Sequence, residues 1–349
     1  MNKGSNTLIS SYIYKILVLI VFVVLVTLVS CKKNSAPVPS EGTNRCNCPN
    51  EGECYNFEKT DSPTVGWTYI SDSAQNVRPC FNPKNSSEIV FVKQGQLSEQ
   101  LVKYNMATKE KKILYTGRVF FQPKWSSTGW IIFSGTGNQI WKIKDDGSNL
   151  TQLTFKNRNF YPEWAPDGKC FCYGKIIDTV LNGRNTALGV GIIADENGYT
   201  ISEMDYTQNL GIGTISFWDK SNTILGGSIN NSILFYNPDS KQTRSYNLNF
   251  CDDIYSLYCT SAKDSNQFFL SSKGGIFNFN THTNSNSCIA KNCDSRTYIF
   301  FSYSDLSNKI IVDCAHNTPN YDKGEIYHKN VLYLMNEDGS DKQLIDIPN

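Results

Sequence analysis

Two insertions in the sequence carry side chains that could bind a polar ligand. One insertion, residues 177–190, contains Arg184. The other, residues 314–330, contains His316, Tyr321, Asp322 and His328. Because binding residues concentrate in long loops on a rigid scaffold, we expect these side chains to contribute to one polar binding site. The alternative is that both insertions are tolerated surface loops without a ligand.

Five charged residues lie between successive units of the repeat described below. They are Arg118, Arg158, Asp252, Asp253 and Arg296. The repeat places them at the same end of the fold as the two insertions. We therefore expect all ten residues to frame one mouth of a central channel.

Catalytic chemistry finds little support in the sequence. The chain has 3 histidines, and His282 is expected on the opposite face from His316 and His328, so a histidine-rich metal centre is not expected. Glycosidases need two facing carboxylates, but among 32 acidic residues some pair will meet that condition by chance. The G-x-S-x-G motif of propeller-containing peptidases is absent from the sequence. We predict no catalytic residue, no bound metal and no cofactor.

Composition excludes some classes of protein. The 349 residues include 33 Lys and Arg against 32 Asp and Glu, so the chain lacks the positive charge of a nucleic-acid binder. Apolar residues make up 40% and aromatic residues 13%, which is typical of a globular protein and not of a disordered one.

The first 30 residues have the features of a secretory signal. They contain Lys3 and Lys15, no acidic residue, and the apolar run ILVLIVFVVLVTLV at residues 16–29. This run is shorter than the roughly 20 residues that a spanning helix needs. A cationic start, a short apolar run and small residues at its end indicate a signal peptide over residues 1–30. An uncleaved signal anchor is the alternative.

The end of that segment, LVSC at residues 28–31, resembles the bacterial lipobox. The resemblance implies cleavage before Cys31 and attachment of lipid to this residue, which would anchor the chain to a membrane. Lys32 follows where inner-membrane lipoproteins have Asp, so we expect the outer membrane of the cell envelope. Residues 31–45 are polar and contain Pro and Ser, which predicts a flexible tether.

The other 11 of the 12 cysteines follow Cys31. Disulfides persist in exported proteins, and an odd number leaves at least one thiol free or paired with another chain. The Cys-rich segment 46–76 has little core of its own, so we expect two disulfides among Cys46, Cys48, Cys54 and Cys80, with a zinc site as the alternative.

Later cysteines allow local pairs as well. We expect such pairs at Cys251 with Cys259 and at Cys288 with Cys293. Cys170 and Cys172 stand two apart on a predicted strand and so face the same side, where they are expected to pack as small apolar groups.

Residues 77–349 repeat with a period of roughly 40 residues, which indicates a solenoid, a propeller or an array. One half of the unit, as in YPEWAPDGKCFCY at 161–173, has an aromatic residue, a turn and an alternating strand. The other half, as in QIWKIKDDGSNLTQL at 139–153, is typical of a hairpin. The halves alternate six times, which predicts an all-β, six-bladed β-propeller of four-stranded antiparallel blades. Seven blades are the alternative.

One aromatic residue recurs near the end of the first strand of most units. These residues are Phe81, Trp125, Trp164, Trp218 and Tyr303. We expect them to fill the wedges between blades, and the alternative is a platform for a ligand. Acidic turns at 145–147, 195–198 and 336–339 could suggest calcium, but Asp, Asn and Gly in a hairpin turn explain them more simply.

The run IWKIKDDGSNLTQLTFKNRNFYPEWAPDG at residues 140–168 resembles the WD-like propeller repeat of the TolB family, periplasmic proteins of the Tol–Pal system. The likeness is strong over 139–172, fair over 77–135 and 331–347, and weak over 207–295. The resemblance implies a six-bladed propeller with protein partners. TolB's separate N-terminal α/β domain does not fit into residues 32–76, so a TolB protein itself is not expected.

These observations lead to one expected function and one alternative. We expect a monomeric, lipid-anchored envelope protein whose propeller binds a protein partner without catalysis. The alternative is a carbohydrate-binding or carbohydrate-active propeller that uses the same mouth.

Overall fold

The structure is a computed structural model. It describes residues 68–348, with gaps at 72–73, 182–183, 205–214, 219–221, 227–231, 248–258, 264–265, 273, 294 and 321. Several expectations concern residues outside this part: the signal peptide, Cys31, the tether, Cys46, Cys48, Cys54, Cys251, Asp252, Asp253 and Tyr321. The side chains of Arg184 and Cys259 also lie outside the described residues.

Five sheets are regular blades of four antiparallel strands each. Blade 1 comprises β2 (Ala74–Asn82), β3 (Asn85–Gly95), β4 (Glu99–Asn105) and β5 (Lys111–Thr116). Blade 2 comprises β6 (Val119–Trp125), β7 (Trp130–Gly135), β8 (Gln139–Lys144) and β9 (Thr151–Gln152). The 3₁₀ turn η1 (Thr136–Asn138), between β7 and β8, is the single helical element in the part of the chain that the structure describes.

The next three blades follow the same order. Blade 3 comprises β10 (Arg158–Trp164), β11 (Cys170–Leu181), β12 (Arg184–Asp195) and β13 (Thr200–Met204). Blade 4 comprises β14 (Ile215–Trp218), β15 (Ile224–Gly226), β16 (Ser232–Asn237) and β17 (Gln242–Asn247). Blade 5 comprises β18 (Cys259–Ala262), β19 (Gln267–Ser272), β20 (Gly275–Asn280) and β21 (Ser285–Lys291).

The last sheet, called the closing sheet here, departs from this pattern. It contains β22 (Arg296–Ser304), β23 (Lys309–Asn320), β24 (Glu325–Asn336), β25 (Gln343–Leu344) and also β1 (Thr68–Ser71). β1 runs parallel to the first part of β24, whereas β25 pairs antiparallel with a later part of the same edge. The expectation of six four-stranded antiparallel blades is therefore wrong: five sheets have this form, and the closing sheet has five strands and mixed pairing.

Both insertions are strands and not the long loops that we expected. Residues of the first insertion extend β11 and β12, which stay in register from the Cys170–Asp195 pair to the Leu181–Arg184 pair. The second insertion extends β23 and β24 in the same way, up to the Asn320–Glu325 pair. The extension of β24 beyond the blade gives it an edge long enough for two short strands, which is why β1 can join the closing sheet.

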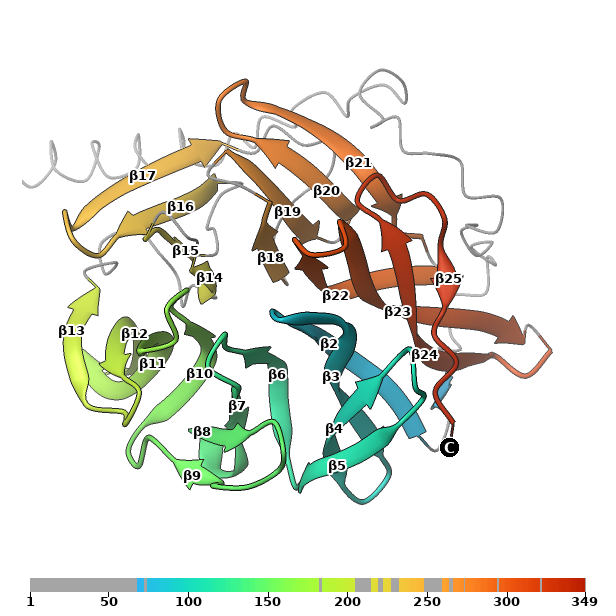
Figure 1. Ribbon diagram of the computed structural model, residues 1–349, viewed down its shortest axis with the longest axis horizontal. Coiled ribbons are helices and arrows are strands. Elements are labelled where there is room, and N and C mark those ends of the chain that lie inside the picture. Colours follow the sequence, from blue (N-terminus) through green and yellow to red (C-terminus); the bar gives the residue numbers. More distant parts are fainter. Residues whose placement is uncertain are drawn as a thin grey trace, which may run out of the picture. The chain divides into compact units, whose positions relative to one another are not determined.

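The first strands of the sheets form a closed ring of contacts around a hub (Figure 1). β2 contacts β6, β6 contacts β10, and the series continues through β14, β18 and β22 back to β2. The fourth strands lie on the outside of the ring. This arrangement confirms the propeller-like, all-β architecture that the repeat predicted.

Apolar side chains fill the spaces between neighbouring sheets. The recurring aromatic residues Phe81, Trp125, Trp164, Trp218 and Tyr303 are all buried, with 4–8% of their surface exposed. One cluster joins Phe81 and Phe91 of blade 1 to Ile311 and Leu332 of the closing sheet. The predicted wedge role of these aromatic residues is confirmed, and the cluster shows how hydrophobic packing closes the ring.

Four cysteines in the described residues are free: Cys80, Cys170, Cys172 and Cys314. The expectation that Cys80 forms a disulfide is therefore wrong, because this thiol is buried at the end of β2, inside the propeller. Cys172 is buried in the core as expected, whereas Cys170 is half-buried. Cys288 and Cys293 are not among the free thiols, and a disulfide at either stays a prediction.

No helix in the described residues is long and apolar enough to span a membrane.

The seam between blade 1 and the closing sheet contains a buried carboxylate. Asp313 of β23 accepts hydrogen bonds from the backbone N–H of Arg78 in blade 1 (2.8 Å) and from that of Phe300 in β22 (2.7 Å). Burial raises the pKa of Asp313 to about 6, although these N–H groups and the positive charge of Arg78 oppose the shift. One carboxylate thus joins the first and the last sheets of the ring.

The raised pKa of Asp313 predicts a pH dependence of stability. The folded state holds the proton more tightly than the unfolded state, so the contribution of Asp313 is greatest below pH 4 and falls as the pH rises through 6. The decrease should be about 3 kcal/mol. Urea unfolding of the wild type and of Asp313→Asn across pH 4–7 measures it. The difference between the two should change over this range, and a constant difference would contradict the assignment.

Candidate functional site

The two predicted histidines lie on the extended hairpin, where neighbouring side chains bind them. Nε2 of His316 is 3.1 Å from the hydroxyl of Tyr333. His328 has a partner at each ring nitrogen: Oδ1 of Asn317 at 2.7 Å and Nδ2 of Asn330 at 3.0 Å. Burial lowers the pKa of His328, which favours the neutral ring. Asn330 also donates to Gln75 of β2, so this cluster fastens the hairpin to blade 1.

The other described residues of the predicted mouth each contact a neighbour on their own sheet. Arg158 forms an ion pair with Asp178 at 2.6 Å, but both side chains are largely exposed, so the pair contributes little. Arg118 lies over the ring of Phe120, with 5.6 Å between the guanidinium carbon and the ring centroid. Arg296 is buried beside Tyr298, and Asp322 lies in the turn between β23 and β24. These residues do not share a partner in the described part of the chain.

A cavity of about 350 Å³, called the hub cavity here, lies at the other end of the first strands. It is lined by the last residues of β2, β6, β10, β14 and β22 and by the turns that follow them. The insertions and the predicted mouth belong instead to the end where these strands begin. Sequence reasoning therefore missed this cavity, because it searched for a site at the face with the long insertions.

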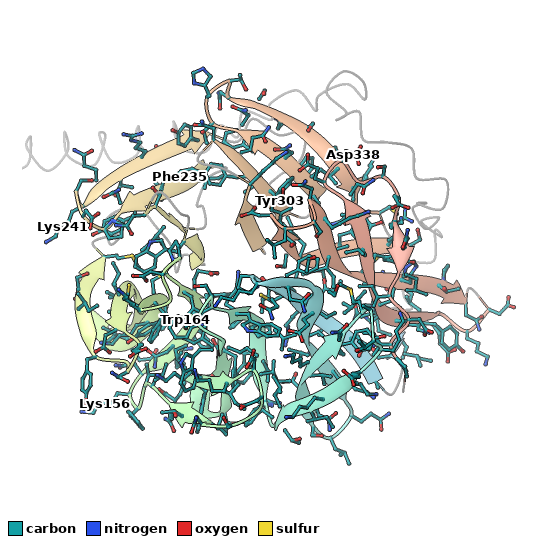
Figure 2. The ribbon with its side chains drawn as sticks, viewed as in Figure 1. Lys156, Trp164, Phe235, Lys241, Tyr303 and Asp338 are labelled. Carbon is teal, nitrogen blue, oxygen red and sulfur yellow. The ribbon has the colours of Figure 1, made fainter. Side chains whose placement is uncertain are left out.

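Aromatic side chains form much of the wall of the hub cavity. All five recurring aromatic residues line it, so they serve both as inter-blade wedges and as a cavity wall. Figure 2 labels Trp164 and Tyr303, which come from different sides of the ring. The alternative of an aromatic platform is thus compatible with the core role, because a wedge at the end of a first strand has one edge toward the hub.

Two tryptophans of this wall have buried indole N–H groups without an acceptor. Nε1 of Trp125 and Nε1 of Trp164 are buried and make no hydrogen bond within the described residues. In contrast, Nε1 of Trp218 donates to Oδ1 of Asn222 at 2.8 Å. Buried polar groups are almost always satisfied, so an unsatisfied donor beside a cavity indicates a missing acceptor.

An ion pair between two blades lies in the same cavity. Nζ of Lys124 in blade 2 is 2.7 Å from Oε2 of Glu163 in blade 3, and the two side chains are 15% and 10% exposed. Burial raises the pKa of Glu163, while Lys124 acts in the opposite direction. A buried pair of this kind fixes the relative position of its partners more than it adds stability.

The inner side of this region is held by Gln122 of β6. Its Nε2 donates to the carbonyl of Pro79 in blade 1 (2.5 Å) and to that of Phe301 in the closing sheet (2.8 Å). A single buried amide therefore connects three first strands, which makes the walls of the hub cavity rigid. Rigid walls reduce the entropy that is lost when a ligand binds.

The chemistry of the hub cavity favours binding over catalysis. Burial raises the pKa of the Cys80 thiol, so this potential nucleophile is held in its unreactive protonated form. The one carboxylate of the ion pair already has a cationic partner. Among the described residues, no group of three or more His, Cys, Asp or Glu side chains could hold a metal ion. What the cavity offers is aromatic surface and two free hydrogen-bond donors.

Comparison with known proteins supports the fold. No family model matches the chain, and no curated protein matches it. The solved structure of a putative TolB from Agrobacterium tumefaciens is similar with a TM-score of 0.51 and 14% identity, over 70% of this chain and 86% of that one. An acylaminoacyl peptidase from Pyrococcus horikoshii is similar with a TM-score of 0.52 and 9% identity, over 81% of this chain and 54% of the peptidase. At such identities the likeness shows the fold alone, and this chain has a TolB-like propeller fold.

Proposed function

We propose that this chain is a non-enzymatic protein-binding module of the bacterial cell envelope, and that its partner inserts a segment into the hub cavity. The observation that carries the proposal is the pair of buried indole N–H groups of Trp125 and Trp164, which lack acceptors at the cavity wall. Backbone carbonyls of a polypeptide segment are acceptors of the right kind.

The rim of the hub cavity favours a protein over a small polar ligand. Leu306 lines the cavity and exposes 60% of its surface. It lies in the turn after β22, next to Asp305. An exposed leucine beside a cavity with aromatic walls is typical of the apolar centre of a protein interface.

The envelope location rests on the sequence. The cationic, apolar first 30 residues and the lipobox-like end at Cys31 support export and a lipid anchor, and Lys32 supports the outer membrane. A tether over residues 31–45 would let the propeller reach a partner near that membrane. We take the protein to act as a monomer.

Site-specific photo-crosslinking in cells that express the full chain tests this function. A photoreactive amino acid at Leu306 should give one discrete protein adduct. The same amino acid at Leu97, an equally apolar residue that is fully exposed between β3 and β4, should not give it. The double variant Trp125→Phe, Trp164→Phe keeps the aromatic wedges but removes both donors, and it should reduce the adduct at least fivefold.

Two outcomes contradict the proposal. One is the same adduct from both positions, and the other is an adduct that the double variant leaves unchanged. Carbohydrate binding would be indicated instead if a glycan raised the melting temperature of the wild type but not that of the double variant, without any protein adduct.

A further inference from the structure

Four first strands carry a β-bulge at the same place, before the residues that line the hub cavity. The register shifts lie between Val77 and Cys80, between Phe120 and Lys124, between Phe160 and Glu163, and between Tyr298 and Phe301. In three of these bulges one residue has left-handed backbone: Arg78 (φ 57°), Phe121 (φ 56°) and Tyr161 (φ 54°).

This backbone conformation is costly for these residue types. Arg78 and Tyr161 each precede a proline, and a residue before proline disfavours helical backbone conformations. Such a conformation costs on the order of 1–3 kcal/mol per residue and persists where the surrounding structure enforces it, often at functional sites. The recurrence in three consecutive blades shows that the strain belongs to the architecture of the hub.

The strained side chains meet over the hub. The ring centroids of Phe121 in blade 2 and Tyr161 in blade 3 are 4.0 Å apart. The guanidinium carbon of Arg78 in blade 1 is 5.9 Å from the ring centroid of Phe300 in the closing sheet. The charge of Arg78 also interacts with Tyr161. Because blades 1 and 3 are separated by blade 2, these two side chains can approach each other only across the hub.

Arg78 and Tyr161 retain hydrogen-bonding capacity. Nη1 of Arg78 donates to the carbonyl of Val119 at 2.6 Å, and no carboxylate of the described residues forms an ion pair with the guanidinium. The hydroxyl of Tyr161 has no hydrogen-bond partner among the described residues. Burial raises the pKa of Tyr161 to about 12, so the hydroxyl keeps its proton and remains a donor.

The two nearest acids are engaged elsewhere. Asp313 accepts the backbone N–H groups of Arg78 and Phe300, as described above. Glu99 accepts the backbone N–H of Val119 at 2.6 Å through Oε2 and Nε2 of Gln94 at 3.1 Å through Oε1. The positive charge of Arg78 therefore has nearby acids but no bonded anion.

We propose that Arg78 and Tyr161, with Phe121 and Phe300 beside them, bind an oxyanion within the hub. The guanidinium supplies charge and paired donors, the phenol supplies a further donor, and the aromatic rings reduce the access of water. A carboxylate and a phosphate share the required chemistry. None of the four residues lines the hub cavity, so this site is separate from the proposed partner site.

Titration of the full chain with sodium phosphate and, separately, with sodium acetate tests the site. Sodium chloride keeps the ionic strength constant, and the thermal unfolding midpoint is measured at pH 7. At least one of the two ions should raise the midpoint saturably in the wild type. The stronger ion identifies the source, phosphate for a phosphate ester and acetate for a carboxylate.

Three variants separate the site from general charge effects. Arg78→Met should weaken the response at least tenfold, and Tyr161→Phe, which removes one hydroxyl, should weaken it about fivefold. Arg118→Met removes an exposed arginine at the same end of blade 2 and should leave the response unchanged. If Arg78→Met does not fold, Tyr161→Phe decides. The proposal is overturned if neither ion acts on the wild type, or if Tyr161→Phe responds as the wild type does.

Discussion

Replacement of Trp164 by alanine is expected to lower the free energy of unfolding by about 3–5 kcal/mol. The side chain is 4% exposed and lies in a cluster with Ile132 and Ile140 of blade 2 and Phe171 of blade 3. Its ring centroid is 5.7 Å from that of Phe171, in an edge-to-face arrangement. Loss of the indole would leave a void between two blades and remove this aromatic contact. Urea unfolding of the wild type and the variant gives the difference.

Trp164→Phe is the matched control for that experiment. It keeps an aromatic wedge and removes an N–H group that has no acceptor in the described residues, so it should cost much less than the alanine variant. Equal losses for the two variants would mean that the indole N–H, and not the filled volume, stabilises the wedge. An alanine variant as stable as the wild type would show that Trp164 does not hold the blades together.

The second large effect is expected at Gly198, in the turn between β12 and β13. Its φ is +89°, and a Cβ atom there would lie 2.4 Å from the carbonyl oxygen of Leu153, which belongs to the preceding blade's edge. Gly198→Ala should therefore combine backbone strain with a steric clash, for a loss of about 3–5 kcal/mol. The melting temperature and urea unfolding report this loss.

Gly147 offers a control at the equivalent turn of blade 2. Its φ is +83°, but the nearest atoms to a Cβ there belong to Leu114 at 3.7 Å, an ordinary contact. Gly147→Ala should show the strain alone, about 1–2 kcal/mol. If both glycine variants lose the same stability, the close approach of the Gly198 turn to its neighbouring blade has no energetic importance.

Much of the fold could be predicted because each blade is encoded locally. The alternation of QIWKIK before an Asp-Asp-Gly turn specifies one hairpin without reference to distant residues. Trp125 and Trp164 could be assigned to the core because they recur at one register of the repeat. The closing sheet could not be predicted in the same way, since the parallel pairing of β1 with β24 joins segments more than 250 residues apart.

The insertions show where a local signal was present and not used. Asn182-Gly183 is a strong two-residue hairpin signal in the middle of the first insertion, and alternating apolar residues flank it. The second insertion lacks such a dipeptide at its tip, and its twelve-residue strands depend on each other for pairing.

The candidate site was harder to predict than the fold. The expected mouth residues His316 and His328 are polar and near in sequence, but hydrogen bonding within the hairpin satisfies them. The hub cavity depends on how five aromatic residues from separate sheets are brought around one axis, which no local pattern specifies. Cys80 was assigned to a disulfide from its spacing, whereas its burial depends on the same ring.

The shared edge of β24 has a mechanical consequence. β1 and β25 attach near opposite ends of the described chain, yet each occupies its own stretch of that edge. A pulling force applied ahead of β1 would load the four residue pairs between β1 and β24 first. These pairs would break as a small independent unit, and the circle of first strands would remain intact under tension.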